Sequence, residues 1–303
     1  MYQIDFSTPV HVYFIGIGGI SMSGLAEILL EKHFKVSGSD ARQSALTDML
    51  SDRGAHIYLG QRKENITADI DVVVYTSAIH PDNPEFIAMQ ELSIPSLTRA
   101  ELLGEIMRNY ELPVAISGTH GKTTTTSMVS EILLQADTDP TLSIGGILKS
   151  IGGNIRVGHS PYFVTEACEY TNSFLSFFPK IGIILNIEED HLDFFKDIHD
   201  IRSSFRRFAA LLPADGTLII NRTIPDVEEI YEGLPCRVIT FGGKDADYSV
   251  FRIHYDDKGC AEFELQSTGK PSCTFKLSVP GEHNIYNALA AIALADLFAI
   301  PRD

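Results

Sequence analysis

A glycine- and threonine-rich loop most restricts how this chain folds. The loop reads GTHGKTTT over residues 118–125, follows the apolar run 113–117 and precedes a helical pattern over 126–135. Backbone N–H groups of such a strand-to-helix turn bind phosphates, while Lys122 reaches the β- and γ-phosphates and the Thr123 hydroxyl ligates Mg²⁺. The spacing G-x-x-G-K-T is a shorter variant of the standard pattern, because Ile116 stands where that pattern has its first glycine. The alternative is a threonine-rich helix cap, although consecutive threonines are poor helix starters.

A second glycine-rich segment, GIGGISMSG over residues 16–24, follows the β-rich run 11–15. Glycines at a strand-to-helix turn let the backbone approach a diphosphate, and Asp40, after the second strand, would hold a ribose hydroxyl. The fingerprint is imperfect, because Ser21 occupies the position of its third glycine. We predict a nucleotide diphosphate here, from either NAD or a nucleotide sugar; the alternative is a tight turn without a ligand.

Acidic residues and a histidine follow two further apolar strands. Glu166 ends the run 162–166, and His191 follows the run 181–186 after the acidic stretch 188–190. If both strands are parallel neighbours of the loop strand, their carboxyl ends meet at the edge where ligands bind. We therefore predict that Glu166 and His191 face Mg²⁺ and the terminal phosphate, and that Glu188 and Glu189 form a solvated helix start.

The order of these patterns indicates an α/β protein. Alternating strand and helix signals predict a parallel, Rossmann-like sheet in an N-terminal domain over 1–110. A P-loop-type α/β domain over 111–303 follows, and its segment 248–279 alternates as antiparallel hairpins do.

Composition excludes several classes of protein. The net charge is −16, and no basic face is available for a nucleic acid backbone. The four cysteines fit no zinc pattern and are typical of free thiols in a reducing cytoplasm. No signal peptide is recognisable, and no apolar run approaches the roughly 20 residues that span a bilayer. We expect a cytoplasmic protein without membrane insertion, whose oligomeric state the sequence leaves open.

Together, the motifs resemble the Mur ligase family of peptidoglycan synthesis. The resemblance rests on HVYFIGIGGISMSGLAEIL, SGSD, TSAI, SGTHGKTTTTSMVSEIL, EACEYTNSFL, NIEEDHLDFF and PGEHNIYNALAAIALA, in the family's order over nearly the whole chain. Two positions depart from the common EADES pattern: Cys168 replaces an aspartate and Tyr170 a serine. Both glutamates of that motif are retained, which leaves the ligand assignment in place.

The resemblance implies roles for individual residues. In the first domain, the residues near the UDP-sugar would be Gly16, Gly18, Gly19, Asp40 and Ser77. In the second domain, the residues that bind ATP would be Gly118, Thr119, His120, Gly121, Lys122, Thr123, Thr124, His283 and Asn287, the last two near the adenine. Lys122, Glu166 and His191 would act in catalysis, and Thr123, Glu166 and His191 would surround the metal.

The resemblance also implies a reaction. The lactyl carboxylate of UDP-N-acetylmuramate attacks the γ-phosphate of ATP to give an acyl phosphate, and L-alanine then displaces phosphate to form an amide. Family members have a third, C-terminal domain that supplies residues for the amino acid, whereas this sequence stops at Asp303. We therefore expect the chain to bind nucleotide ligands and to ligate poorly or not at all.

Three alternatives remain at this point. A murein peptide recycling ligase of the same family adds a whole peptide to the same sugar, and the GIGGISMSG segment favours the alanine-adding members over it. An NAD-dependent dehydrogenase would explain residues 16–24 and Asp40, but hydride transfer needs no triphosphate site. A non-catalytic nucleotide-sensing module is the third.

Overall fold

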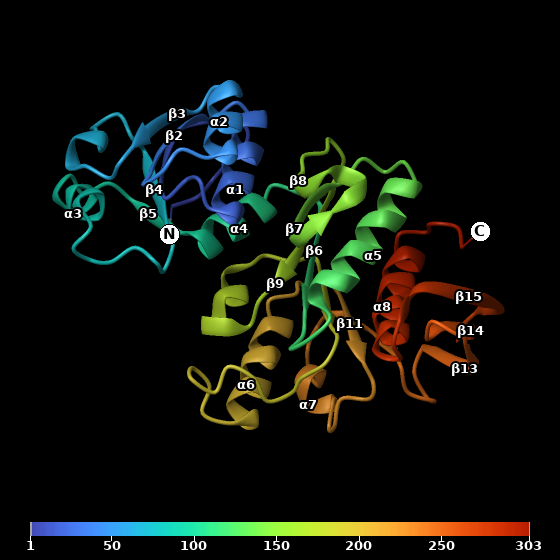
Figure 1. Ribbon diagram of the computed structural model, residues 1–303. Helices are drawn as coiled ribbons and strands as arrows, with labels where there is room; N and C mark the ends of the chain where they lie inside the picture. Colours follow the sequence, from blue (N-terminus) through green and yellow to red (C-terminus); the bar gives the residue numbers. More distant parts are fainter. Residues whose placement is uncertain (1, 303) are drawn as a thin grey trace. The chain divides into compact units, whose positions relative to one another are not determined.

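The computed structural model describes residues 2–302, which form two compact units. One unit ends at Asn109 and the other begins at Tyr110 (Figure 1). Among the described residues, no helix is both long enough and apolar enough to cross a membrane.

The first unit is built on a five-stranded, all-parallel sheet in the order β3-β2-β1-β4-β5. The strands are β1 His11–Ile15, β2 Lys35–Asp40, β3 His56–Leu59, β4 Val72–Tyr75 and β5 Ser96–Thr98. The helical segments are α1 Ile20–Glu31, α2 Ala45–Asp52, η1 Lys63–Asn65, α3 Pro84–Glu91 and α4 Arg99–Met107. Because the strand order reverses between β1 and β4, the carboxyl ends of these strands border the position where such sheets bind ligands.

Local sequence explains several helix boundaries in this unit. Thr98 accepts a hydrogen bond from the Glu101 N–H, and the Glu101 side chain accepts one from the Thr98 N–H, so α4 begins with a capping box. Asn83 caps α3 with Pro84 in its first turn. Strand β2 continues through Gly38 and ends at Asp40. A β-carbon at Gly38 would lie 2.6 Å from the Phe14 carbonyl oxygen, so this glycine permits close packing rather than ending the strand.

The second unit contains a ten-stranded mixed sheet in the order β15-β14-β13-β12-β11-β10-β6-β9-β7-β8. Its central strands are parallel, whereas β7–β8 and β13–β14–β15 are antiparallel. The strands are β6 Leu112–Ser117, β7 Thr141–Leu148, β8 Gly153–Arg156, β9 Tyr162–Ala167, β10 Ile181–Ile184, β11 Thr217–Asn221, β12 Arg237–Phe241, β13 Tyr248–Tyr255, β14 Cys260–Ser267 and β15 Lys270–Pro280. The helical segments are α5 Lys122–Gln135, η2 Lys149–Ile151, η3 Tyr170–Ser176, α6 Ile198–Ala209, α7 Glu228–Tyr231 and α8 His283–Leu297. This mixed architecture confirms the predicted fold class.

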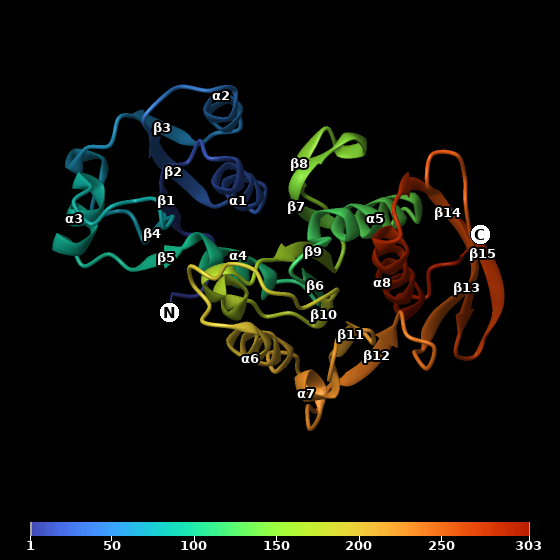
Figure 2. The same cartoon turned by 60° about the horizontal axis from the view of Figure 1, so that its bottom comes forward.

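Helices α5 and α8 lie side by side on the sheet of the second unit (Figures 1 and 2). Leu133 of α5 and Leu289 of α8 are both buried in one core with strand residues such as Ile116 and Ile183. The small side chains of α8, which is rich in alanine, let it bury residues around most of its circumference. This packing holds the start of α5, where the GTHGKTTT loop ends, against the sheet.

Candidate functional site

A strand-to-helix turn over residues 118–121 connects β6 to α5, as predicted. The helix begins at Lys122 and not at residue 126 as predicted, so the threonines that follow Lys122 lie within the helix. Gly118 and Gly121 have φ values of +144° and +85°, which glycine adopts far more easily than other residues. Helix α5 begins at Lys122, and its N-cap residue, Gly121, provides no side-chain hydrogen bond. A 14-residue helix therefore starts without a side-chain cap, and its backbone N–H groups and dipole favour an anion at this position.

The threonines of the loop have different surroundings. The Thr123 side chain is exposed and donates to Glu166, whereas Thr126 donates back to the Lys122 carbonyl within the helix. Thr125 is fully buried, and Thr124 is half-buried in the first helical turn. Thr123 thus combines exposure with an acidic neighbour, whereas Thr126 satisfies its hydroxyl within the helix. Phosphate contact by Thr123 and Thr124 stays a prediction.

Asn186, just after β10, forms hydrogen bonds with the loop backbone. It was not predicted from the sequence as a site residue. Its Oδ1 accepts from the His120 N–H at 2.7 Å, and its Nδ2 donates to the His120 carbonyl at 3.0 Å. The buried Thr119 is held in the same way, because its N–H donates to the Asn186 carbonyl at 3.2 Å. The His120 side chain itself is exposed. These contacts fix the backbone of the loop before any ligand is present.

Strands β9 and β10 both pair with β6 in parallel, which confirms the predicted neighbours. Ile116 is opposite Glu166, so the carboxyl ends of the three strands meet beside the loop. Glu166 is half-buried and already partnered: Oε2 accepts from the Thr123 hydroxyl at 3.0 Å, and Oε1 accepts from the Gly145 N–H at 2.5 Å. Both carboxylate oxygens thus have protein partners in this structure, and the role of Glu166 as a metal ligand stays a prediction.

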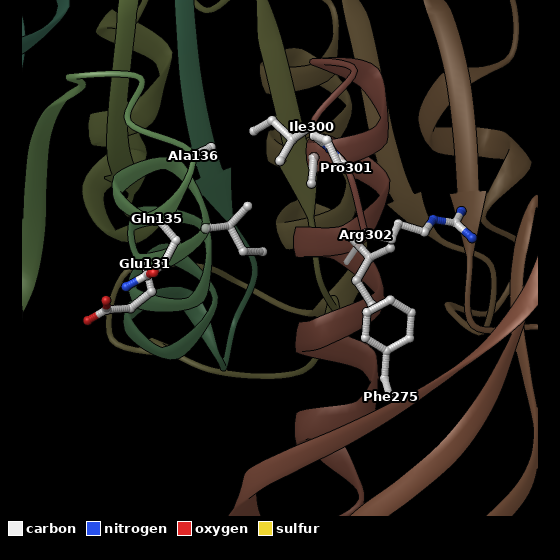
Figure 3. Close-up of a pocket in the computed structure, with 10 residues that line it drawn as sticks. Glu131, Gln135, Ala136, Phe275, Ile300, Pro301 and Arg302 are labelled. Atoms are coloured by element: carbon white, nitrogen blue, oxygen red, sulfur yellow. The ribbon is translucent and has the colours of Figure 1, made fainter.

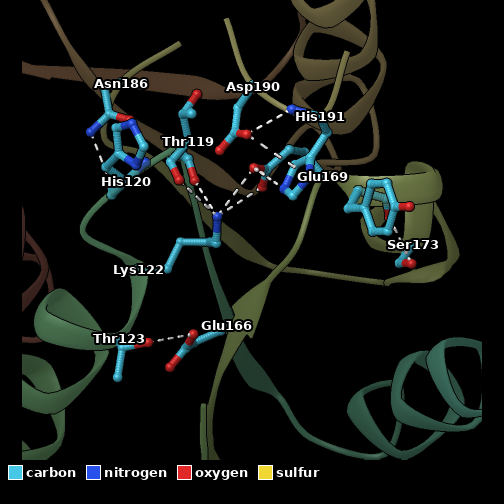
Figure 4. A network of polar contacts seen from close by, with 12 residues as sticks. Thr119, His120, Lys122, Thr123, Glu166, Glu169, Ser173, Asn186, Asp190 and His191 are labelled. Atoms are coloured by element: carbon cyan, nitrogen blue, oxygen red, sulfur yellow. Dashed lines mark hydrogen bonds and ion pairs between the residues drawn. The ribbon is translucent and has the colours of Figure 1, made fainter. Parts of the chain in front are cut away.

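A second acidic residue, Glu169, lies at the centre of the site (Figure 4). Its side chain is 2% exposed, and its two oxygens lie 2.9 and 3.2 Å from the Lys122 Nζ. His191 lies on the other side of this carboxylate, with Nε2 3.9 Å from Oε1. Sequence reasoning retained Glu169 only as a motif residue, although it lies three positions after Glu166 in EACE, which was the available signal.

His191 therefore lies beside Glu169, whereas Glu166 contacts Thr123 (Figure 4). The backbone of His191 is left-handed, with φ of 52°, and its N–H donates to the Asp190 carboxylate at 2.7 Å. Such a conformation costs about 1–3 kcal/mol and is typical of functional sites. The acidic stretch before it is exposed at Glu188 and Glu189, as predicted. The prediction that it starts a helix was wrong, because α6 begins only at Ile198.

Tyr170 supports His191. The two rings stack at 4.4 Å between centroids, and the Tyr170 hydroxyl donates to Asp193 at 2.7 Å. This hydrogen bond, together with the Asp193 charge, raises the pKa of Tyr170. Tyr170, which replaces the serine of the common motif, thus packs against the His191 imidazole.

The two residues predicted near the adenine lie at the start of α8. Asn287 is 4% exposed and faces the loop, because a β-carbon at Gly121 would lie 2.6 Å from its Oδ1. His283 is exposed at the first position of the helix. Asn287 is thus a packing partner of the loop in this structure, and its contact with a base remains a prediction.

The first unit brings its predicted residues to adjacent strand ends. Gly16 and Gly19 lie between β1 and α1, and Gly18 donates its N–H to Asp40 Oδ2 at 2.9 Å. Asp40 therefore braces the glycine loop rather than standing free. Ser77 is exposed in the segment after β4, the strand on the other side of β1.

A cavity of about 450 Å³ lies elsewhere in the second unit (Figure 3). It is lined by Gln135, Phe275, Ile292 and Ile300, among others. Gln135 ends α5, and at 1.5 Å per residue it is about 20 Å from the phosphate-loop end of that helix. The cavity is separate from the candidate site, and Arg302, the cation in its lining, is paired with Asp296.

Known proteins with the same sequence pattern define the class. The Mur ligase middle domain matches residues 116–295, and the domain described as Mur ligase family, catalytic domain matches residues 11–111. The chain belongs to the Mur ligase family.

Two curated relatives are each named UDP-N-acetylmuramate–L-alanine ligase. The relative from Agathobacter rectalis is 59% identical over all of this chain and 66% of its own length; that from Lachnospira eligens is 62% identical over 97% and 64%. The chain thus spans just under two thirds of these relatives. A crystal structure of UDP-N-acetylmuramate:L-alanyl-γ-D-glutamyl-meso-diaminopimelate ligase from Neisseria meningitides superimposes with a TM-score of 0.84 at 28% identity, covering 97% of this chain and 95% of that one.

Proposed function

We propose that this chain provides the UDP-sugar and ATP sites of a ligase that joins L-alanine to the lactyl carboxylate of UDP-N-acetylmuramate. The observation that carries the proposal is the meeting of β6, β9 and β10, which brings the phosphate loop, Glu166 and the Glu169–His191 pair to one sheet edge. The names of the relatives at 59% and 62% identity support the choice of substrates.

The second unit would bind ATP through the loop. The uncapped start of α5 and the glycine backbone favour the β- and γ-phosphates, and Lys122 adds a positive charge at the same end. Asn186 keeps the loop backbone in place, so little ordering is needed when the nucleotide binds. His283 and Asn287, on the neighbouring helix, would lie on the adenine side.

The donors around Thr123 suit Mg²⁺. A hydroxyl and a carboxylate oxygen 3.0 Å apart are the hard ligands that this ion prefers. The space beside them is kept open by glycine, because a β-carbon at Gly145 would lie 2.6 Å from Glu166 Oε2. Within residues 2–302 no group of three or more His, Cys, Asp or Glu side chains is arranged as a metal site, so phosphate oxygens and water would complete the shell. The resemblance also implies His191 as a metal ligand, although this structure places its side chain beside Glu169.

The reaction joins two anions, and the residues present would reduce their repulsion. A lactyl carboxylate oxygen bonds to the γ-phosphorus while the bond to the ADP oxygen breaks. The alanine nitrogen then attacks the acyl carbon, phosphate leaves with the bonding electrons, and the nitrogen loses a proton. Lys122 and the α5 N–H groups would stabilise charge on the transferring phosphoryl group. Bound Mg²⁺ would add charge neutralisation at Thr123 and Glu166.

The first unit would hold the UDP portion of the sugar substrate. Gly16, Gly18 and Gly19 form the turn at the start of α1, a helix whose N-cap residue provides no side-chain hydrogen bond. Asp40 is the last residue of β2, and Ser77 follows β4; these two strands lie on either side of β1. A reaction that uses ATP and a nucleotide sugar also leads us to place the protein in the cytoplasm.

The alternatives fit less well. A recycling ligase shares the fold at 28% identity, about half the identity seen with the alanine-adding relatives. A dehydrogenase leaves the loop, Lys122 and Glu166 without a role. A sensing module leaves unexplained the left-handed His191 beside a buried carboxylate.

Calorimetric titration tests the proposal directly. The chain is titrated with UDP-N-acetylmuramate, with ATP in the presence and absence of Mg²⁺, and with NADH. We expect saturable binding of the UDP-sugar and of ATP, with ATP binding strengthened by Mg²⁺, and no binding of NADH. Binding of NADH in place of the UDP-sugar would overturn the assignment of the first unit, and loss of the Mg²⁺ effect in a Glu166→Gln variant is the expected check on the metal ligands.

A further inference from the structure

The Lys122 ammonium is fully engaged within the protein. Its Nζ lies 2.6 Å from the Gly118 carbonyl oxygen and 3.2 Å from that of Thr119, in addition to both oxygens of Glu169. An ammonium has three protons to donate, and four acceptors surround this one. Lys122 is therefore turned back over its own loop rather than extended toward the space beyond it (Figure 4).

Glu169 is held tightly in this arrangement. The carboxylate is 2% exposed and the Lys122 side chain 16% exposed, so water screens their attraction only weakly. A buried carboxylate that loses its cation is costly unless another partner remains. Of the side-chain contacts described, the one with His191 Nε2, 3.9 Å from Oε1, would remain.

Phosphate binding conflicts with this pairing. A triphosphate that uses Lys122 needs the protons now given to Glu169, and the buried negative charge also repels the incoming phosphates. We propose that Glu169 is a resident counter-anion, which occupies Lys122 when no nucleotide is bound and which the triphosphate replaces at the ammonium. This inference rests on the proposed ATP site and adds a competition step to it.

The exchange has a consequence for selectivity. Because Lys122 would contact the β- and γ-phosphates, the exchange concerns a triphosphate and not a nucleotide that has only an α-phosphate. Removing the Glu169 charge would strengthen triphosphate binding, although the residue lies within the site. If Glu169 only supported the structure of the site, removing its charge would weaken triphosphate binding.

Calorimetry with the non-hydrolysable analogue AMP-PNP and with AMP, at fixed Mg²⁺ and ionic strength, tests the exchange. Glu169→Gln keeps the side-chain size and removes the charge; we expect AMP-PNP to bind about tenfold more tightly and AMP binding to stay unchanged. Glu169→Asp keeps the charge on a shorter side chain and should fall between this variant and the original chain. Glu264→Gln is the matched control, because it removes a carboxylate paired with Arg252 at 2.8 Å on the β13–β14 hairpin; it should change neither affinity.

The outcomes separate the inference from the function on which it rests. If the original chain binds AMP-PNP and the folded Glu169→Gln variant binds it equally or more weakly, the counter-anion role is wrong but the nucleotide site stands. Absence of AMP-PNP binding in both chains defeats the proposed nucleotide site and the inference together. Binding that appears only after Glu169→Gln supports both. If Glu169→Gln does not fold, the aspartate variant decides, because a tightening of about threefold is expected and no tightening contradicts the exchange.

Discussion

Asn287 on α8 lies directly against Gly121 in the phosphate loop: a β-carbon at Gly121 would be 2.6 Å from the Asn287 Oδ1. Gly121 also has a φ of +85°, so an alanine here is strained even where space is available. The start of α5 thus requires glycine at position 121, because the Asn287 side chain occupies the space that a β-carbon there would need.

We therefore expect Gly121→Ala to weaken ATP binding more than tenfold and to destabilise the second unit by about 1–3 kcal/mol. Titration calorimetry and thermal unfolding measure the two effects. Gly152→Ala is the matched control, because Gly152 has a φ of +68° with nothing within 4 Å of an added β-carbon. It should show the backbone cost without loss of ATP binding; equal ATP affinities in both variants would contradict the role given to the loop.

Asn186→Ala should weaken ATP binding about tenfold. The variant removes two hydrogen bonds to His120, each worth about 1 kcal/mol, which hold the loop in its binding conformation. Asn83→Ala serves as the control, since Asn83 caps α3 in the first unit and contacts no loop residue named here. Its thermal stability should fall while ATP affinity stays constant. Unchanged ATP affinity in Asn186→Ala would show that the loop is fixed without this clamp.

Gly18→Ala should abolish measurable binding of UDP-N-acetylmuramate. The added β-carbon would lie 2.8 Å from Asp40 Oδ2, and the shift needed to relieve this contact moves the carboxylate that braces the glycine loop. Gly54→Ala in the same unit has a φ of +101° and no atom within 4 Å, so it tests backbone strain alone. Retained UDP-sugar affinity in Gly18→Ala would place the sugar elsewhere.

The lowered pKa of Asp296 gives a prediction for how the free energy of unfolding depends on pH. Burial alone would raise the pKa of this carboxyl, but Arg302, Lys270 and Tyr248 outweigh it and hold the pKa below its usual range. A folded-state pKa below the unfolded one stabilises the protein above the unfolded pKa of about 3.9, and this contribution is lost as pH falls through the folded value. We expect Asp296→Asn to lower the unfolding temperature at pH 7, and the gap to the original chain to shrink below pH 4. A gap that stays constant down to pH 3 would contradict this assignment.

Sequence patterns predicted several strands that are buried on both faces, because short continuous apolar runs are typical of such strands. The predicted run 11–15 coincides with β1, and the run 181–186 contains β10; both strands are fully buried. The short strand β5 and helix α3 carry weaker patterns and were not predicted. The strongly amphipathic helix α6 was also missed, because the acidic stretch 188–190 was interpreted as a helix start.

The sequence predicted which residues gather at the site but not which side chains pair with each other. Motif spacing indicated that Lys122, Thr123, Glu166 and His191 share one sheet edge. It could not indicate that Lys122 pairs with Glu169, because Glu166 lies at the end of β9 while Glu169 follows that strand, and only the turn after β9 decides where Glu169 points. Asn186 was missed for a similar reason, since a clamp made with backbone groups leaves no pattern in the sequence.

The ten-stranded sheet ends in strands that discourage pairing with another chain. At one end, β15 carries Lys270, Pro271, Lys276 and Pro280, and proline offers no N–H to a neighbouring strand. At the other end, β8 has four residues and leaves little backbone to extend. The antiparallel additions at both ends of the parallel core therefore give the second unit protection against edge-to-edge aggregation, which its buried apolar strands would otherwise invite.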